Sequence, residues 1–198
     1  MQHRISLTCL RYRLRPVRLE DAAFIVALRT DPLLSRFVHE ISPRVEDQVE
    51  WLKGYFKRAG DYYFTIEDVE SLDPHGTIGL YNVGSGSAEW GRWIVKRGSM
   101  AALESAWLIG EAAFTNLKLA ELRSHTLSEN RATISFHDSF GASRAGVLQQ
   151  QVLVRGERRA VIEHRITAVE WPALRARHYS TIVRLASGIS SHRGYVLA

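Results

Sequence analysis

Residues 88–142 read AEWGRWIVKRGSMAALESAWLIGEAAFTNLKLAELRSHTLSENRATISFHDSFGA. Strands are predicted at 88–95 and 121–127, and helices at 101–116, which is apolar over most of its circumference, and at 130–140. The order is therefore strand, turn, apolar helix, strand and second helix. A strand that runs directly into a helix start leaves backbone N–H groups and the positive end of the helix dipole facing outward. The first strand–helix junction is thus predicted to be a ready anion site.

The flanking sequence predicts further strands and helices around this stretch. Strands are expected at 12–17, 62–67 and 77–83, a closing hairpin at 147–154 and 160–166, and helices at 19–28, 42–57 and 169–185. Ser42-Pro43 marks the start of the second helix, because Ser caps a helix and Pro fits its first turn. We expect the polar end beyond Leu185 to fray.

Composition favours one compact domain, with room for a small appendage. The chain has 198 residues, of which 45% are hydrophobic and 24% charged, so it can bury a real core. Its single cysteine, Cys9, excludes an internal disulfide framework and leaves no cysteine pair for zinc, which fits a reducing, cytoplasmic location. No apolar run approaches the length of a membrane span and no signal peptide is visible, so we expect neither membrane insertion nor export.

The charge balance favours an anionic ligand. The formal net charge is +5 and the pI is about 9.6, but the basic residues are spread along the chain rather than clustered. No base-reading or aromatic-stacking module is visible, so nucleic acid is not expected as a partner. A phosphorylated cofactor or substrate accounts for the excess of arginine equally well.

Four stretches carry a family resemblance: GTIGLYNV at 76–83, AEWGRWI at 88–94, the helix–strand–helix run at 101–142, and IEHRI at 162–166. In order and spacing they resemble the GNAT superfamily of acyl-CoA N-acyltransferases. Within it, the chain is most similar to the branch of Rim-type ribosomal-protein N-terminal acetyltransferases and many small-molecule and amino-sugar acetyltransferases. The resemblance covers residues 11–167.

That resemblance implies a fold and a domain organisation. The fold is α/β, with a central mixed, mostly antiparallel, splayed sheet of about six to seven strands flanked by about four helices. Residues 1–169 would form the acetyltransferase domain and residues 170–198 a C-terminal helical extension and tail. Acetyl-CoA would be the co-substrate.

The family's pyrophosphate loop, Q/R-x-x-G-x-G/A, aligns with Arg97-Gly98-Ser99-Met100-Ala101-Ala102. Arg97 and Ala102 match the pattern, whereas Met100 stands where a glycine is usual. Small residues let the backbone approach phosphate closely enough for N–H to oxygen bonds. The resemblance therefore implies phosphate binding by the backbone of 98–102, with charge from Arg97. An ordinary turn before a core helix is the alternative.

Further donor contacts are implied beside this loop. The strand carrying Glu89 splays from its neighbour in this fold, so backbone groups at Ile94 and Val95 are expected to bind the pantetheine amides. Asn130 and Thr133 resemble the family's N-x-x-S segment beside the same arm. Asn130 also reads as a simple helix cap, and both roles can hold together.

Two residues are candidates for acid–base chemistry by resemblance. Many relatives carry a tyrosine that protonates the departing thiolate, and here His137 occupies its position; an imidazolium is a competent acid near neutral pH. Alternatively, His137 is a surface residue of the helix, paired with Asp138 or solvent. Glu89 is the best-placed base for the acceptor amine. It is equally consistent with a strand residue facing solvent or pairing with Arg92.

Acceptor-binding candidates come from one strand and one loop. The spacing of Trp90 and Trp93 predicts opposite faces of the strand, with one ring in the core and the other in the acceptor pocket. Gly91 between them is a candidate for a bulge. His39-Glu40 lies in the loop between the first two helices, which usually shapes acceptor specificity in this family.

The remaining histidines, His75, His125 and His164, are expected to be structural, buried or surface-paired. None has metal-ligand spacing with another histidine or carboxylate, so no metal is expected.

These residues lead to three functional hypotheses. The first is an acetyl-CoA-dependent N-acetyltransferase for a primary amine of a small molecule, with a nucleotide-linked amino sugar as the preferred acceptor. The second is acetylation of a protein N-terminus, and the third is a non-catalytic acyl-CoA-binding domain. The C-terminal segment from Trp171 leaves a homodimer open, and a solvated basic tail is equally consistent.

Overall fold

The computed structural model describes residues 3–154 and 156–193. Its described strands form a single eight-stranded sheet in the order β1-β2-β3-β4-β5-β6-β8-β7. The strands are β1 (Leu7–Thr8), β2 (Tyr12–Pro16), β3 (Tyr62–Asp68), β4 (Pro74–Gly84), β5 (Ser87–Val95), β6 (Glu121–Leu127), β7 (Ser143–Val154) and β8 (Glu157–Thr167). All neighbours are antiparallel except β5 and β6. The predicted mixed, mostly antiparallel fold is confirmed, with the two-residue β1 as an addition.

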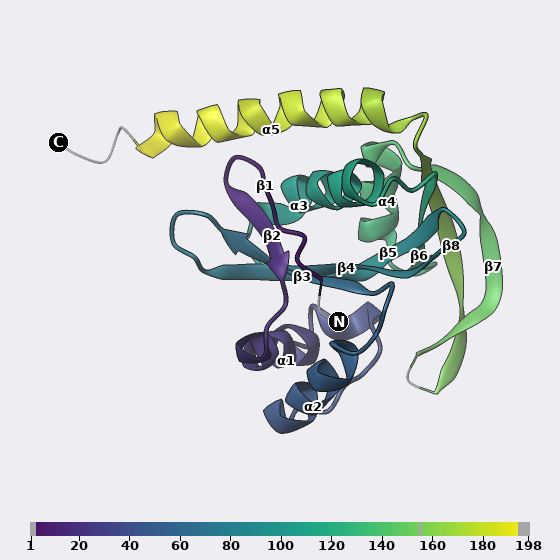
Figure 1. The fold of residues 1–198 in the computed structure, drawn as a ribbon. Coiled ribbons are helices and arrows are strands. Elements are labelled where there is room, and N and C mark those ends of the chain that lie inside the picture. The colour runs from purple at the N-terminus through teal and green to yellow at the C-terminus, as the bar shows by residue number, and fades with distance from the viewer. Residues whose placement is uncertain (1–2, 155, 194–198) are drawn as a thin grey trace.

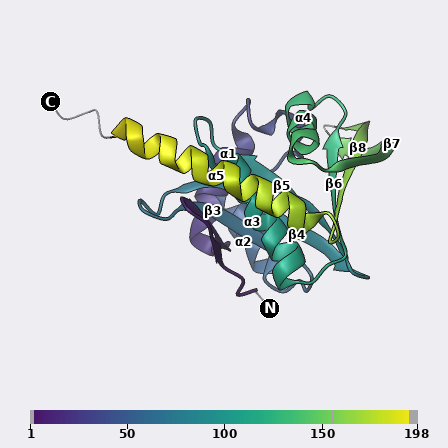
Figure 2. The ribbon, with the colours of Figure 1, turned by 90° about the horizontal axis from the view of Figure 1, so that it is seen from above.

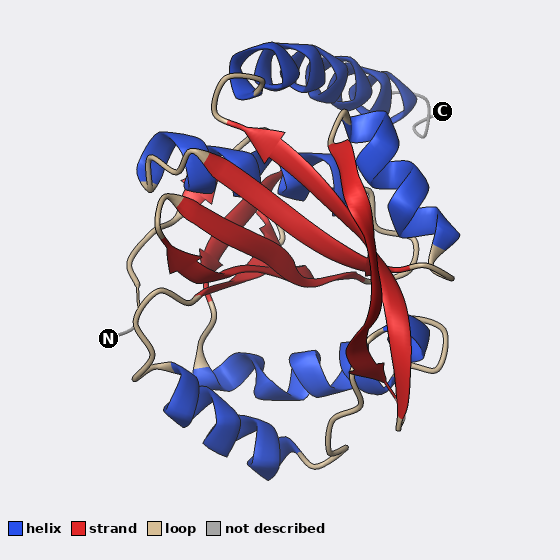
Figure 3. Cartoon of the chain, turned by 90° about the vertical axis from the view of Figure 1, so that its right-hand side faces the viewer, coloured by secondary structure: helices blue, strands red, loops and turns tan. Residues whose placement is uncertain are grey.

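Helices cover both faces of this sheet. They are α1 (Ala22–Thr30), α2 (Val45–Tyr55), α3 (Ala101–Gly110), α4 (Arg131–Phe140) and α5 (Trp171–Arg193), and a π-helical segment, Glu111–Asn116, continues α3. α1 and α2 lie on one face, and α3, α4 and α5 lie on the other (Figures 1 and 3). The last helix continues to Arg193, so the fraying predicted beyond Leu185 does not begin before that residue; the rest of the predicted tail, residues 194–198, lies outside the described residues.

α5 is fixed to α3 by a tryptophan over a glycine. A Cβ atom at Gly110 would lie 2.1 Å from the Trp171 ring, so only glycine permits this approach. The Trp171 indole N–H donates to Glu111 at 3.0 Å, and Arg175 Nε donates to the same carboxylate oxygen at 2.8 Å. α5 therefore lies across the outer side of α3, as the view from above shows (Figure 2).

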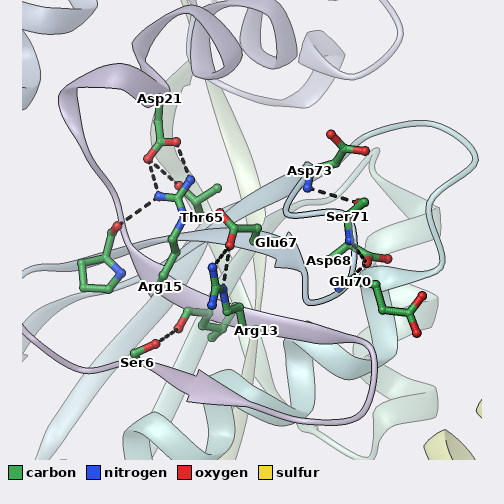
Figure 4. A network of polar contacts seen from close by, with 12 residues as sticks. Ser6, Arg13, Arg15, Asp21, Thr65, Glu67, Asp68, Glu70, Ser71 and Asp73 are labelled. Atoms are coloured by element: carbon green, nitrogen blue, oxygen red, sulfur yellow. Dashed lines mark hydrogen bonds and ion pairs between the residues drawn. The ribbon is translucent and has the colours of Figure 1, made fainter.

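A buried polar network connects β2, β3 and the start of α1 (Figure 4). Arg15 donates from both terminal nitrogens to the two oxygens of Asp21, at 2.8 Å each, and its Nε donates to Glu67. Asp21 also accepts from the Thr65 hydroxyl at 2.9 Å. Buried charges persist where pairing and hydrogen bonds compensate the loss of hydration. This network fixes where α1 begins on the sheet.

The parallel pair β5–β6 separates after three residue pairs. Ser87, Ala88 and Glu89 face Glu121, Leu122 and Arg123, and the ladder stops there. β5 continues to Val95 along β4, whereas β6 continues to Leu127 along β8. Beyond Glu89, the facing edges of β5 and β6 are thus not joined by a ladder. This separation is the splay predicted for the sheet.

A bulge in β5 lies at the start of this separation. Gly91 pairs with Gly79 and Ile94 pairs with Thr77, so two residues of β5 face one residue of β4. Arg92 is in the left-handed region, with φ of 50°. The bulge therefore occupies Arg92 and Trp93, directly after the Gly91 at which it was predicted.

Candidate active site

A cavity of about 660 Å³ reaches from α1 and the loop before α2, past β4, β5 and β6, to the start of α4. It is the larger of the two cavities described. Its lining includes all but one of the residues predicted for catalysis and acceptor binding: Glu89, His137, His39, Trp90 and Trp93. Asn130 and Thr133 from the predicted donor site also line it. The cavity therefore brings together residues from both faces of the sheet at the β5–β6 separation.

Glu89 lies in this cavity within a set of hydrogen bonds. It accepts from the Tyr81 hydroxyl at 2.7 Å and the Asn82 amide at 3.3 Å, and one of its oxygens lies 3.2 Å from His125 Nδ1. Burial opposes ionisation, but the contacts with His125 and Tyr81 outweigh it and lower the pKa of Glu89. Glu89 is thus a carboxylate at neutral pH. The alternative pairing with Arg92 is wrong, because Arg92 pairs with Asp61.

His125 is a site residue that the sequence analysis did not single out. Its Nδ1 faces Glu89, and its Nε2 lies 2.9 Å from Glu163. The hydrogen bond to Glu89 and then that to Glu163 raise the pKa of His125 above its ordinary value, against the effect of burial. The pairing of His125 with Glu163 follows from the strand register, because the two residues lie directly opposite each other in the β6–β8 pair.

Trp90 and Trp93 lie on the same face of β5, with ring centroids 5.4 Å apart. The prediction of opposite faces is wrong, because the bulge at Arg92 adds a residue to the simple alternation. Trp90 is buried and Trp93 half-buried, and both line the cavity. Trp93 also packs on Phe136 of α4, with centroids 4.7 Å apart.

The bulge places Arg92 among aromatic rings on the other side. Its guanidinium carbon is 4.7 Å from the Tyr81 ring centroid and 5.4 Å from that of Tyr63. Two nitrogens of Arg92 donate to the two oxygens of Asp61, so its charge is neutralised. Arg92 is therefore a structural cation of the cavity wall.

His137 is buried on α4 rather than exposed. Its ring meets Trp90 edge-on, with centroids 4.7 Å apart, and stacks on His164 at 5.0 Å. Burial, aided by His164, lowers the pKa of His137 to about 3. At neutral pH the ring is uncharged, so the predicted imidazolium acid and the alternative of a surface residue are both wrong. A catalytic role for the neutral ring stays a prediction.

Three buried polar atoms on cavity-lining residues have no hydrogen-bond partner among the described residues. They are Nδ1 of His137, Nε1 of Trp90 and Nε of Arg29. An indole N–H can only donate, and a neutral imidazole offers one donor and one acceptor. Buried polar atoms are normally paired, so the unpaired atoms of Trp90 and His137 are candidates for a hydrogen bond to a ligand. The residues present thus fit a thioester at this position.

The predicted pyrophosphate loop lies outside the cavity lining, at the start of α3. Gly98 has φ of 74°, and Ser99 Oγ accepts from the Ala101 N–H at 3.2 Å and lies 2.8 Å from His75 Nδ1. Met100 is the residue before the helix, and its side chain has no oxygen with which to cap it; the residue is 51% exposed. Phosphate binding by Arg97, Gly98, Ser99, Met100, Ala101 and Ala102 stays a prediction.

Backbone groups predicted for the donor lie on the separated part of β5. Ile94 and Val95 pair with Thr77 and Gly76 of β4, and the β5–β6 ladder does not reach them. Asn130 Oδ1 accepts from the Thr133 N–H at 3.3 Å, so Asn130 caps α4 while lining the cavity. The predicted cap is confirmed, and contact of Asn130 with the pantetheine arm stays a prediction.

Of the two acceptor-binding residues predicted in the loop between α1 and α2, one lines the cavity and the other does not. His39 is exposed at the cavity, and its carbonyl oxygen accepts from Arg29 Nη2 at 2.8 Å. Glu40 is not among the cavity-lining residues. Arg29 of α1 also lines the cavity, although the sequence analysis did not select it.

Within residues 3–154 and 156–193, no group of three or more histidine, cysteine or acidic residues is arranged to hold a metal ion. No helix in the described part of the chain combines the length and apolar character needed to cross a membrane.

Comparisons with known proteins agree on the fold. A family model described as an acetyltransferase (GNAT) domain matches residues 11–143. A structure described as apo FdhC, a nucleotide-linked sugar GNAT, has a TM-score of 0.75 and 26% identity, covering 89% of this chain and 97% of its own. A GCN5-related N-acetyltransferase from Brucella melitensis has a TM-score of 0.78 and 21% identity, covering 90% and 85%.

A variant of the spermidine N-acetyltransferase SpeG from Vibrio cholerae also matches, with a TM-score of 0.71 and 19% identity, covering 81% of this chain and 96% of its own. No curated protein sequence matches the chain.

Proposed function

Since the chain belongs to the GNAT family of acetyltransferases, we propose that this acetyl-CoA-dependent N-acetyltransferase acts on the primary amine of a nucleotide-linked amino sugar. The observation that carries the proposal is the Glu89–His125–Glu163 contact chain at the wall of a cavity with aromatic sides. Carboxylates can receive an ammonium group, and aromatic rings pack on the C–H faces of a sugar. The likeness to a nucleotide-linked sugar GNAT at 26% identity supports the acceptor class.

Glu89 and His125 together offer a route for the acceptor's proton. An amine is protonated at neutral pH and must lose a proton before it attacks a thioester carbonyl. Glu89 alone is a weak base because its pKa is lowered. A proton that reaches Glu89 can pass to Nδ1 of neutral His125, 3.2 Å away, and the resulting imidazolium lies between two carboxylates. The raised pKa of His125 favours that transfer.

Acetyl-CoA supplies the acetyl thioester for this reaction. The predicted donor site places the thioester between β5 and β6, beside the unpartnered Trp90 Nε1 and His137 Nδ1. An N–H donor aimed at a developing oxyanion or thiolate stabilises it in a site that excludes water. We therefore propose that Trp90 and the neutral His137 act as hydrogen-bond donors, and that Glu89 acts as the base.

Other predicted properties accompany this proposal. The residues that carry the family resemblance support a place in the Rim-type branch. The single cysteine supports a cytoplasmic location. The division at residue 169 into a domain and a C-terminal extension also stays a proposal. A homodimer remains open; half-exposed apolar side chains of α5, such as Tyr179 and Leu185, offer a surface for it.

An acceptor panel tests the proposed function. The panel contains nucleotide-linked amino sugars, the corresponding free amino sugars, a polyamine, and peptides that start with Ser or Ala, and thiol release from acetyl-CoA is followed. We expect the highest kcat/KM for a nucleotide-linked amino sugar. Turnover confined to the peptides would instead establish protein N-terminal acetylation. Binding of acetyl-CoA without transfer to any amine would leave a non-catalytic acyl-CoA-binding domain.

A further inference from the structure

Arg29 differs from the other arginine and carboxylate side chains of the cavity wall. Arg92 is paired with Asp61, and Glu89 contacts His125. Arg29 has no carboxylate partner among residues 3–154 and 156–193. The cavity thus contains one guanidinium whose charge this part of the protein does not neutralise.

The hydrogen bonds of Arg29 are also incomplete. A guanidinium carries five N–H donors. In the described structure Arg29 makes one side-chain hydrogen bond, from Nη2 to the carbonyl oxygen of His39, and its buried Nε has no acceptor. Burial lowers the pKa of Arg29, and the nearby charge of Arg92 adds to this effect. Arginine nevertheless stays charged in proteins, so the charge remains in the cavity.

Stability does not account for an arginine at this position. Withdrawing a charge from water without pairing it costs free energy, and apolar residues of similar size commonly serve a protein interior better. Arg29 is held in place, because the Arg15–Asp21 pair fixes the start of α1 and the His39 carbonyl accepts from the guanidinium. A fixed, unneutralised guanidinium is the side chain best suited to bind a phosphate or carboxylate group.

We propose that Arg29 binds an oxyanion carried by the acceptor, namely the diphosphate of a nucleotide-linked amino sugar, and so determines acceptor specificity. This inference rests on the proposed function for the identity of the acceptor. Glu89 and Arg29 line one cavity, so an acceptor with an ammonium group and an oxyanion meets a carboxylate and a guanidinium in the same site. A polyamine has no group for Arg29 to bind and is repelled by it.

Binding of inorganic pyrophosphate tests the site without knowledge of the sugar. Acetyl-CoA is kept saturating, so that the donor site is filled and pyrophosphate is left with the acceptor cavity. The wild-type chain, Arg29→Gln, Arg29→Lys and the control Arg44→Gln are compared by calorimetry. Arg44 is a suitable control because its side chain is 70% exposed and it does not line the cavity. We expect at least tenfold weaker binding in Arg29→Gln, an intermediate loss in Arg29→Lys, and wild-type affinity in the control.

Kinetics and unfolding complete the test. In Arg29→Gln, KM should rise at least tenfold more for the nucleotide-linked amino sugar than for the same sugar without its nucleotide. The melting temperature of Arg29→Gln should equal or exceed that of the wild type, because an unneutralised charge is removed. If Arg29→Gln melts at a lower temperature than the wild type, Arg29→Lys, which keeps the charge, is used to distinguish a loss of folding from a loss of pyrophosphate binding.

The outcomes distinguish this inference from the proposed function. Equal pyrophosphate affinity in the wild type and Arg29→Gln would overturn the oxyanion site, whatever the acceptor is. Pyrophosphate binding that depends on Arg29, with no turnover of nucleotide-linked sugars, would retain the site and reject the proposed function. In that case an amine that carries a carboxylate, such as an amino acid, is the next acceptor to assay.

Discussion

The ring centroids of Trp90 and Trp93 lie 5.4 Å apart on one face of β5. Trp93 comes three positions after Trp90, a spacing that regular alternation would put on opposite faces. The left-handed conformation of Arg92 makes this arrangement possible. It brings the Trp90 indole N–H, the ring of His137 and the Trp93 face to the same side of the β5–β6 separation. One bulged residue therefore assembles the aromatic wall of the proposed acetyl-transfer site.

Replacing Glu89 by Gln should lower kcat by a factor of about 100 or more, in the range typical of a lost general base. Acetyl-CoA affinity should change little, because Glu89 lies away from the predicted phosphate loop. Steady-state kinetics and a calorimetric titration with acetyl-CoA check the two parts. Glu46→Gln is the control, since the Glu46 side chain is 75% exposed. An unchanged kcat in Glu89→Gln would contradict the assignment of the base.

The dependence of kcat on pH should reflect the protonation of His125. Its pKa is raised by Glu89 and then by Glu163, so the rising limb of kcat against pH should lie above the ordinary imidazole pKa. Glu163→Gln should move that limb to lower pH while leaving kcat at the plateau nearly unchanged. NMR titration of the His125 ring in both proteins gives an independent measurement. A limb that does not move would show that His125 takes no part in proton transfer.

Stability should also depend on His125 and pH. A histidine whose folded pKa is raised stabilises the protein fully below its unfolded pKa of about 6.5, and this stabilisation is lost as pH rises through the folded pKa. His125→Gln should therefore be most destabilising near pH 5.5 and least destabilising near pH 9. Urea unfolding at the two pH values measures the difference. A larger effect at the higher pH would contradict the direction of the shift.

Arg15→Met should be among the most destabilising single substitutions in the chain. It leaves Asp21 and Glu67 buried without their common cation, and breaking a buried pair in this way costs about 3–5 kcal/mol. Urea unfolding measures the change. Arg44→Met, at an exposed position, should change stability by less than about 0.5 kcal/mol. Similar values for the two variants would show that the buried network contributes little.

Gly110→Ala and Gly54→Ala should have opposite effects on the melting temperature. Both glycines lie in helices, where alanine is favoured by about 1 kcal/mol. At Gly54 nothing lies within 4 Å of an added Cβ, so the melting temperature should rise. At Gly110 the added Cβ would meet the Trp171 ring at 2.1 Å, so α5 must move and the melting temperature should fall. Stabilisation by both substitutions would show that α5 is not fixed by this contact.

Local patterns were sufficient to predict most of the fold. The strands predicted at 62–67, 121–127 and 160–166 are observed at Tyr62–Asp68, Glu121–Leu127 and Glu157–Thr167, and the signals that predict them lie within each segment. Trp90 and Trp93 were placed wrongly because a bulge is a change in register, and the register depends on the neighbouring strand β4. A non-glycine residue in the left-handed conformation, such as Arg92, has no sequence signature of its own.

The cavity residues that the sequence analysis missed depend on contacts distant in sequence. His125 meets Glu163 only through the pairing of β6 with β8. Arg29 was not selected because the sequence does not show which cations lack a partner after folding. The protonation of His137 was predicted wrongly for a related reason: its position on α4 was correct, but the burial that lowers its pKa comes from Trp90 and His164.

Three residue pairs between β5 and β6 are the whole ladder between the β1–β5 and β6–β8 parts of the sheet. The backbone ladder thus joins the two parts of the sheet at one end, and side chains of the common core pack across the rest. A pantetheine arm bound along the free edges, as predicted at Ile94 and Val95, would act as an additional strand between the two parts. Loading the donor should therefore complete the backbone hydrogen bonds of the sheet next to Glu89.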